Sequence, residues 1–200
     1  MIYICGDSFA VPDPEFGTMW VDILEKKLGQ PVVNLAQRCA SNLMISQQVN
    51  SITAADFVIV LFTASTRTQI RRKKQIVPVS WHSLDDSTGL DQDNLMLLQA
   101  YFRDFFDLDI AIFESQCIIE ATLQRLVDRN QQFVFDQGGF QHPSYGGTDR
   151  YFAKYDAWRS DLCLWDYCQN RVLRPYYHIT EPLIHEKIAN YYFNLINAAS

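Results

Sequence analysis

The chain has 200 residues, 48% of them apolar, and a formal net charge of -6 at pH 7. A chain of this length buries a substantial core as one domain and leaves little for a second, so we predict a single domain over residues 1–200. Lys and Arg total 17 against 23 Asp and Glu, which argues against a nucleic-acid binder and against attachment to an anionic membrane surface.

Cysteine usage favours a reducing compartment. The five cysteines are odd in number and widely spaced, so we expect free thiols in place of a disulfide framework, and no spacing indicates a metal site or another cofactor. The sequence starts without a basic segment followed by a long apolar one, and no apolar run is long enough for a bilayer. We therefore expect a cytoplasmic protein, or one carried on a virion if a phage encodes it.

The first part of the chain alternates strands with helices. The predicted elements are a strand over 2–5, a helix over 18–28, a strand over 31–36, a helix over 41–49 and a strand over 56–63. The helices show apolar residues at helical spacing, and the strands are short apolar runs rich in branched residues. The run DFVIVLFT at 56–63 is the strongest strand pattern, and we place it at the centre of the sheet.

The later part of the chain is less regular. We predict a polar loop or insertion over 64–93, helices over 95–128 with a break near Leu108, a strand over 131–137, a weakly periodic region over 141–181 with a short helix at 161–168, and a final helix over 180–196. The basic run from Arg71 to Lys74 is interpreted as a solvated loop edge, with binding of a phosphate or sugar acid as the alternative. Strands that alternate with helices predict an α/β fold, a three-layer α/β/α sandwich with a central parallel sheet.

Residues that directly follow strands are the first candidates for an active site, because active sites of parallel α/β sheets form at the carboxyl ends of the strands. The first strand is followed by GDSFA, which places Ser8 in a turn. A hydroxyl in such a turn can attack an acyl carbon, and the amides of the turn can stabilise the resulting oxyanion. The alternative is that Asp7 and Ser8 only cap the turn.

The second such place is NLAQRCASN at 34–42. A strand that ends in GDS, a Trp on the next helix and then NLA followed by SN together resemble the SGNH (GDSL-like) hydrolase superfamily, in particular divergent members from bacteriophages and bacteria. The resemblance implies a flavodoxin-like hydrolase fold with Ser8 as the nucleophile. It also places Cys39 where the family has a glycine, whose amide joins the serine amide in the oxyanion hole.

The resemblance continues after the central strand, in FTASTRTQ at 62–69. Here the widespread members have an asparagine that donates to the oxyanion, and Thr63 is our candidate for that role because its hydroxyl can donate one hydrogen bond. Thr63 capping a turn is an equal alternative. Arg67 is a candidate for binding an anionic part of the substrate, and Asp7 and Asn42 are further candidates for substrate contact.

The family's fourth block, DxxH, corresponds to the segment RPYYHIT at 174–180, which makes His178 the expected base. Position 175 is a proline, so the acid of that block is missing, and either a Ser-His dyad works alone or Glu181, Asp161 or Asp166 orients the imidazole. His185 lies inside the final helix and is interpreted as a packing residue. His82 and His142 have no partners that the sequence identifies.

Two functions follow from this reading. The first is an esterase or deacetylase that acts on a small ester or an acetylated carbohydrate, since the loops are rich in aromatic residues (Trp81, Tyr145, Trp158, Tyr176 and Tyr177) that can stack on sugar rings, although core packing is the commoner role of such residues. The second is a binding or structural subunit, for example of a phage particle, that keeps the fold without catalysis. The oligomeric state is not predicted.

Overall fold

Four parallel strands form the central sheet of the computed structural model, which describes residues 1–12, 17–72, 75–80, 92–136, 153–162, 164–167, 179 and 181–199. The strands are β1 (Ile2–Cys5), β2 (Val32–Asn34), β3 (Phe57–Leu61) and β6 (Phe133–Asp136), in the order β2-β1-β3-β6. All three pairings are parallel. As predicted, the strand with the longest apolar run lies inside the sheet, and every residue of β3 is buried.

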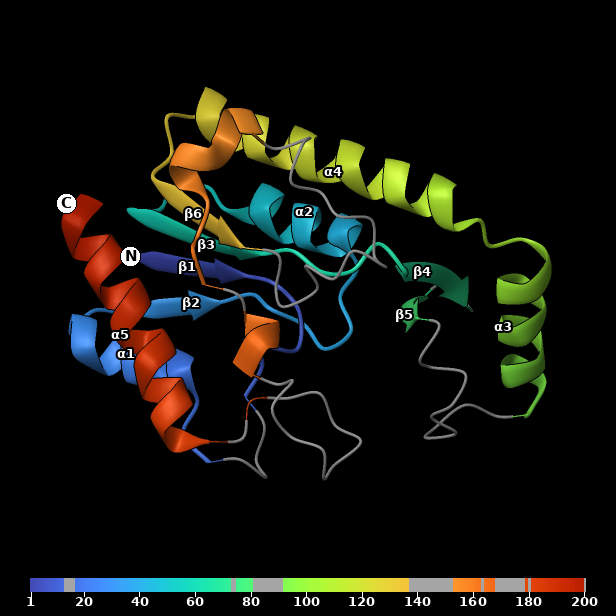
Figure 1. The fold of residues 1–200 in the computed structure, drawn as a ribbon, viewed down its shortest axis with the longest axis horizontal. Coiled ribbons are helices and arrows are strands. Elements are labelled where there is room, and N and C mark those ends of the chain that lie inside the picture. Colours follow the sequence, from blue (N-terminus) through green and yellow to red (C-terminus); the bar gives the residue numbers. More distant parts are fainter. Residues whose placement is uncertain are drawn as a thin grey trace.

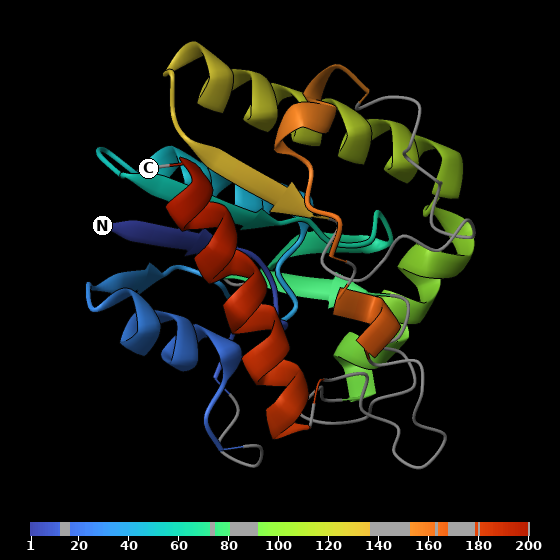
Figure 2. The ribbon, with the colours of Figure 1, turned by 60° about the vertical axis from the view of Figure 1, so that its left-hand side comes forward.

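Helices cover both faces of this sheet. Helices α1 (Trp20–Leu28) and α5 (Pro182–Ala199) pack on one face, and α2 (Asn42–Ser51) and α4 (Leu108–Asp128) pack on the other (Figure 1). Figure 2 shows α5 crossing the sheet beside α1. The predicted three-layer α/β/α sandwich is confirmed.

Burial on both faces explains why the strand sequences are continuously apolar. In β3, Ile59 and Leu61 face the α1–α5 layer, whereas Val58 and Val60 face the α2–α4 layer. The residue after the strand, Phe62, continues into the second cluster and makes an edge contact with Phe135 of β6 at 6.2 Å between ring centroids. The apolar side chains of β3 therefore alternate between the two faces of the sheet.

A smaller lobe stands beyond the carboxyl ends of the strands. Strands β4 (Arg67–Arg72) and β5 (Gln75–Ser80) pair antiparallel, and together with α3 (Gln92–Asp104) they form what we call the side lobe (Figure 1). Val79, Leu98 and Phe102 form its own buried cluster. Of the two alternatives for 64–93, the loop is wrong for 67–72 and 75–80, which pair as strands. The sequence of β4 is polar and shows no apolar alternation, so the hairpin is defined by the pairing of its strands.

The remaining helices are of the type, and lie in the regions, that the sequence predicts. The predicted break near Leu108 separates α3 from α4, and Asp107 caps α4 by accepting a hydrogen bond from the Ile110 N–H at 3.0 Å. Two 3₁₀ helices, η3 (Ala153–Trp158) and η4 (Leu164–Tyr167), lie in the weakly periodic region. The second of them corresponds to the predicted short helix. No described helix combines the length and the apolar character that crossing a membrane requires.

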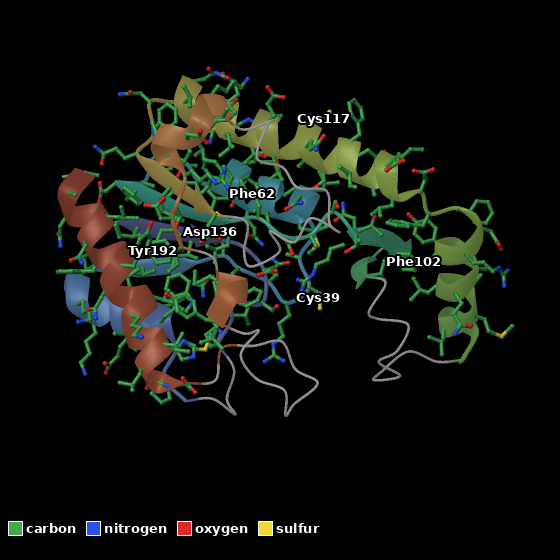
Figure 3. The ribbon with its side chains drawn as sticks, in the orientation of Figure 1. Cys39, Phe62, Phe102, Cys117, Asp136 and Tyr192 are labelled. Atoms are coloured by element: carbon green, nitrogen blue, oxygen red, sulfur yellow. The ribbon has the colours of Figure 1, made fainter. Side chains whose placement is uncertain are left out.

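A buried hydrogen bond fixes α5 to the sheet. The Tyr192 hydroxyl donates to Oδ2 of Asp136 at the end of β6, and the two side chains are labelled together in Figure 3. Tyr192 is fully buried and Asp136 is 2% exposed. Burial, with a smaller contribution from the Asp136 carboxylate, raises the pKa of Tyr192 well above its ordinary value, so the phenol stays protonated and remains a donor. The Tyr192 ring also contacts Trp20 of α1, with centroids 5.1 Å apart.

We expect Tyr192→Phe to lower the free energy of unfolding by about 1.5–3 kcal/mol, the contribution of a hydrogen bond to a charged partner. Urea unfolding measures this loss, and Asp136→Asn completes a double-mutant cycle. A coupling energy near zero between the two substitutions would contradict the assignment of this bond as the link between α5 and the sheet.

Candidate active site

The residues that follow β1 form a tight turn at the carboxyl edge of the sheet. The Ala10 N–H donates to the carbonyl of Asp7 at 3.2 Å, and the Val11 N–H donates to the carbonyl of Ser8 at 3.3 Å. Oδ1 of Asp7 accepts a further bond from the Phe9 N–H at 3.1 Å. Ser8 is therefore held in a turn with defined backbone geometry, and 8% of its surface is exposed.

Gly6 is required here by close packing between two strands. A Cβ at position 6 would lie 2.8 Å from the Cβ of Leu61 on β3, a separation at which something must shift. The side chain of Gln48 on α2 binds both backbone groups of Gly6: Oε1 accepts from the N–H at 2.7 Å, and Nε2 donates to the carbonyl at 3.2 Å. The segment that leads to Ser8 is thus fixed from the sheet side and from α2.

Asp7 connects three segments of the chain. Its Oδ2 accepts hydrogen bonds from Thr63 Oγ1 and from Arg67 Nη1, each at 2.9 Å. The Asp7 side chain has no exposed surface, and that of Arg67 is 15% exposed. A buried carboxylate is tolerated only when it is paired and hydrogen-bonded, and these donors meet that condition. The burial of Asp7 argues for a structural role in place of the substrate contact suggested by the sequence.

Asn42 holds the residue that follows β3 in the same reciprocal way. Its Oδ1 accepts from the Thr63 N–H at 2.8 Å, and its Nδ2 donates to the Thr63 carbonyl at 2.8 Å. Nδ2 also donates to Oγ of Ser115 on α4 at 2.5 Å. Asn42 is 3% exposed. Both amide hydrogens are engaged within the protein, so here too the contacts favour a structural role over substrate contact.

These contacts bear on the expected oxyanion hole. The single hydroxyl proton of Thr63 points to Asp7, and its N–H points to Asn42. Thr63 can therefore donate to an oxyanion only if its hydroxyl leaves Asp7. Arg67, expected to bind an anion, already forms an ion pair with Asp7. The oxyanion role of Thr63 and the anion-binding role of Arg67 stay predictions.

Cys39 adopts a backbone conformation that favours glycine, the residue that it is expected to replace. It occupies the third position of a turn closed by the Ala40 N–H on the carbonyl of Gln37 at 3.2 Å. Its φ is 59°, in the left-handed region that favours glycine. The turn is attached to β1, because the Gln37 N–H donates to the Gly6 carbonyl at 3.1 Å. Cys39 is exposed at this edge of the sheet (Figure 3).

His185 holds the residue that follows His178. His178 lies outside the described residues, as do His82 and His142, but Ile179 is described and is 3% exposed. The Trp20 N–H donates to Nδ1 of His185 at 3.3 Å, which leaves Nε2 to carry the proton and donate to the Ile179 carbonyl at 3.1 Å. His185 is fully buried. These contacts agree with its interpretation as a packing residue.

Only some of the other predicted site residues lie in the part of the chain that the structure describes. Glu181 and Asp161 are exposed, and the side chain of Asp166 lies outside the description, so the acid that would orient His178 stays unassigned. Trp81, Tyr145, Tyr176, Tyr177, Lys73 and Lys74 also lie outside the described residues. Trp158 stacks on Phe133, with centroids 5.4 Å apart, and belongs to the core. Within the described part of the chain, no three metal-binding side chains gather.

A comparison with solved structures finds a similar fold in EstA, a psychrotrophic esterase from Pseudoalteromonas sp. whose crystal structure shows it inhibited by monoethylphosphonate. The TM-score is 0.57 at 13% identity, over 98% of both chains. This likeness shows a shared fold and agrees with the predicted three-layer α/β/α sandwich. AlinE4, described as an SGNH-hydrolase family esterase, covers 99% of this chain and 95% of its own at 14% identity, with a TM-score of 0.46. No protein-family model and no curated protein matches the sequence.

Within this fold, two structural residues of the site were not predicted from the sequence. Gln48 and Ser115 supply hydrogen bonds to the site but belong to no motif. Their signal in the sequence is a polar residue on the inward face of an amphipathic helix, which by itself does not identify the partner. The reciprocal clamp that Asn42 forms was equally invisible, because it depends on the distance between α2 and the end of β3.

The left-handed backbone conformation of Cys39 leads to a testable prediction about the stability of the protein. Cys39→Gly removes a Cβ that is disfavoured at positive φ, and we expect it to raise the free energy of unfolding by about 0.5–1 kcal/mol. Cys39→Ala keeps the Cβ and should give no gain. Cys117→Gly, at an exposed position inside α4, should destabilise the protein. Equal effects of glycine at the two positions, measured by urea unfolding, would contradict this account.

The burial of His185 leads to a second prediction, which concerns how the stability of the protein changes with pH. Burial lowers the pKa of His185 below its ordinary 6.5, with weaker opposing effects from the Ile179 carbonyl and Asp22. The unfolded chain therefore takes up a proton before the folded one does as the pH falls through about 6.5, and stability present above that pH is lost below it. The loss is at most about 1.4 kcal/mol per pH unit for one proton.

The measurement is the free energy of unfolding between pH 8 and 5, for the parent and for His185→Asn, whose Oδ1 can still accept from the Trp20 N–H. We expect the variant to be less stable at pH 8 and to lose less stability on acidification. Parallel pH profiles for the two proteins would assign the acid sensitivity to other groups.

Proposed function

We propose that the protein is a serine ester hydrolase in which Ser8 is the nucleophile and His178 the base. The observation that carries this proposal is the turn after β1: Ser8 sits at the carboxyl edge of a parallel sheet, and the adjacent carboxylate of Asp7 is buried under three hydrogen bonds. The fold shared with an esterase supports the same reaction class. Catalysis requires a nucleophile whose position is fixed in advance, and this turn supplies that condition.

The reaction proceeds in two steps. Ser8 Oγ attacks the ester carbonyl while His178 takes its proton, and collapse of the tetrahedral intermediate expels the alcohol, which receives that proton. Water then attacks the acyl-enzyme with His178 as base, which releases the acid and restores Ser8. The backbone amides of Ser8 and Cys39 stabilise the oxyanion in both steps. The role of Asp7 is to hold the serine turn through Thr63 and Arg67.

A binding or structural role without catalysis is the second candidate, and one observation favours it. The Thr63 hydroxyl and the Asn42 amide donate to partners within the protein, so the side-chain donor of the family's oxyanion hole has no described substitute. Removal of one such donor typically lowers kcat by about 10²–10³-fold. A chain of this kind is either a slow enzyme with two amide donors or a protein that uses the fold for binding alone.

The test uses an activated alkyl phosphonate ester and mass spectrometry. A phosphonate that loses its leaving group to an activated serine leaves a tetrahedral adduct on that side chain. We expect one adduct, on Ser8, with no other serine modified. His178→Ala should slow the labelling by about 10²-fold or more, since a general base contributes at least that factor.

Hydrolysis of an aryl acetate by the parent, lost in Ser8→Ala and His178→Ala variants of unchanged melting temperature, completes the test. If the folded parent forms no adduct and hydrolyses no ester, the catalytic proposal is wrong and the binding role replaces it.

A further inference from the structure

The outward face of the first half of α4 carries an apolar stripe. Ile110, Phe113 and Cys117 are spaced three and four positions apart, so their side chains follow one face of the helix. Ile110 is 58% and Phe113 65% exposed, and Cys117 is exposed as well. Figure 3 shows Cys117 on the side of α4 that faces away from the sheet. We call these three residues the α4 stripe.

Exposed apolar side chains concentrate around this stripe. Of the nine large apolar side chains that are exposed in the described part of the chain, four lie within residues 105–113, namely Phe105, Leu108, Ile110 and Phe113. Single exposed apolar residues are ordinary on a protein surface, whereas a group of neighbouring ones is typical of an interaction site. The α4 stripe is therefore a candidate interface.

The second half of the same helix face is already in contact with another element, η3. Lys154 Nζ donates to Oε1 of Glu120 at 2.5 Å. The Tyr155 hydroxyl donates to Oε1 of Gln124 at 3.0 Å. The exposure of the α4 stripe shows that no described element covers the first half in this way. The first half of the face therefore has room for a second helix.

Acidic residues flank the α4 stripe on both sides. When two helices pack side by side, the positions next to the apolar seam face the partner helix and select its charge. Around Ile110 and Phe113 these positions are Asp109 and Glu114. Neither carboxylate pairs with a cation in the part of the chain that the structure describes. Both flanks therefore favour a partner that carries positive charge.

The same charges argue against a second copy of this chain as the occupant. Two parallel α4 helices would place Asp109 of one beside Glu114 of the other, and two antiparallel ones would place identical residues together. Either arrangement brings carboxylates close to one another, which is unfavourable. Each chain also carries a net charge of -6. A cationic partner avoids this repulsion.

We propose that the α4 stripe binds an amphipathic helix of another protein. The apolar residues of that helix contact the stripe, and its Lys or Arg side chains pair with Asp109 and Glu114. Helices that bind in this mode use apolar anchors at positions i, i+3, i+4 and i+7. The stripe spans about two turns of α4, so the interface is small and the expected Kd is about 10–100 µM. This binding goes beyond the proposed function and does not depend on it.

The test uses a synthetic helical peptide of about three heptads, with Leu at the seam, Lys at both flanks and Ala elsewhere. Binding protects Cys117 from alkylation by iodoacetamide, which mass spectrometry follows. At a peptide concentration about three times the Kd, alkylation of Cys117 should slow about 4-fold, because only the unbound quarter of the protein reacts. Cys39 is the internal control, since it is exposed at the carboxyl edge of the sheet and should react at an unchanged rate.

The anisotropy of a fluorescein-labelled peptide gives the affinity of variants. Phe113→Ala should weaken binding by about 5- to 30-fold, as the loss of a central aromatic anchor does. Glu114→Lys should weaken it by about 3-fold or more, because it places like charges together. Leu183→Ala and Glu186→Lys are the matched controls, since both residues are exposed on α5, Leu183 by 71%. All four variants should keep the parent's melting temperature.

Several results would overturn the proposal. Equal binding of a peptide with Glu in place of Lys would show that the flanking charges select nothing. Equal effects of Phe113→Ala and Leu183→Ala would place the peptide elsewhere. Protection of Cys117 by self-association, or by phosphatidylcholine vesicles and not by the peptide, would assign the stripe to a second copy or to a lipid surface. Peptide binding is measured equally on Ser8→Ala, so its outcome is separate from that of the esterase test.

Discussion

The buried carboxylate of Asp7 is the constraint on which the site depends. It follows β1 directly, and its oxygens accept donors from its own turn, from the residues after β3 and from β4. A charge removed from water in this way stays stable only while its donors remain in place. The position of the Ser8 turn, the exit of β3 and the attachment of the side lobe are therefore coupled through one side chain.

Helix α2 also holds the residues of the site in place. Two of its amide side chains each bind both backbone groups of one residue, Gln48 at Gly6 and Asn42 at Thr63. Backbone groups at the ends of strands have lost their ladder partners, and a side-chain amide offers a donor and an acceptor at the right spacing. The same helix thereby sets the exits of β1 and β3 relative to each other.

The side lobe gives the molecule a second small core next to this edge. Val79, Leu98 and Phe102 bury their side chains there, apart from the two layers that cover the sheet. The lobe is attached through Arg67, which begins β4 and reaches Asp7. A lobe outside the central sheet can vary while the sheet edge keeps its geometry, because surface loops tolerate change better than buried strands.

The sequence by itself determined the layers of the fold and the placement of Ser8, because strand burial and helix amphipathicity are local patterns with fixed periods. It also identified the break at Leu108. Only the tertiary structure decided the partners of Asp7, Asn42 and Gln48 and the pairing of β4 with β5. These depend on distances between segments far apart in the chain, and a polar residue carries no local sign of which distant group will satisfy it.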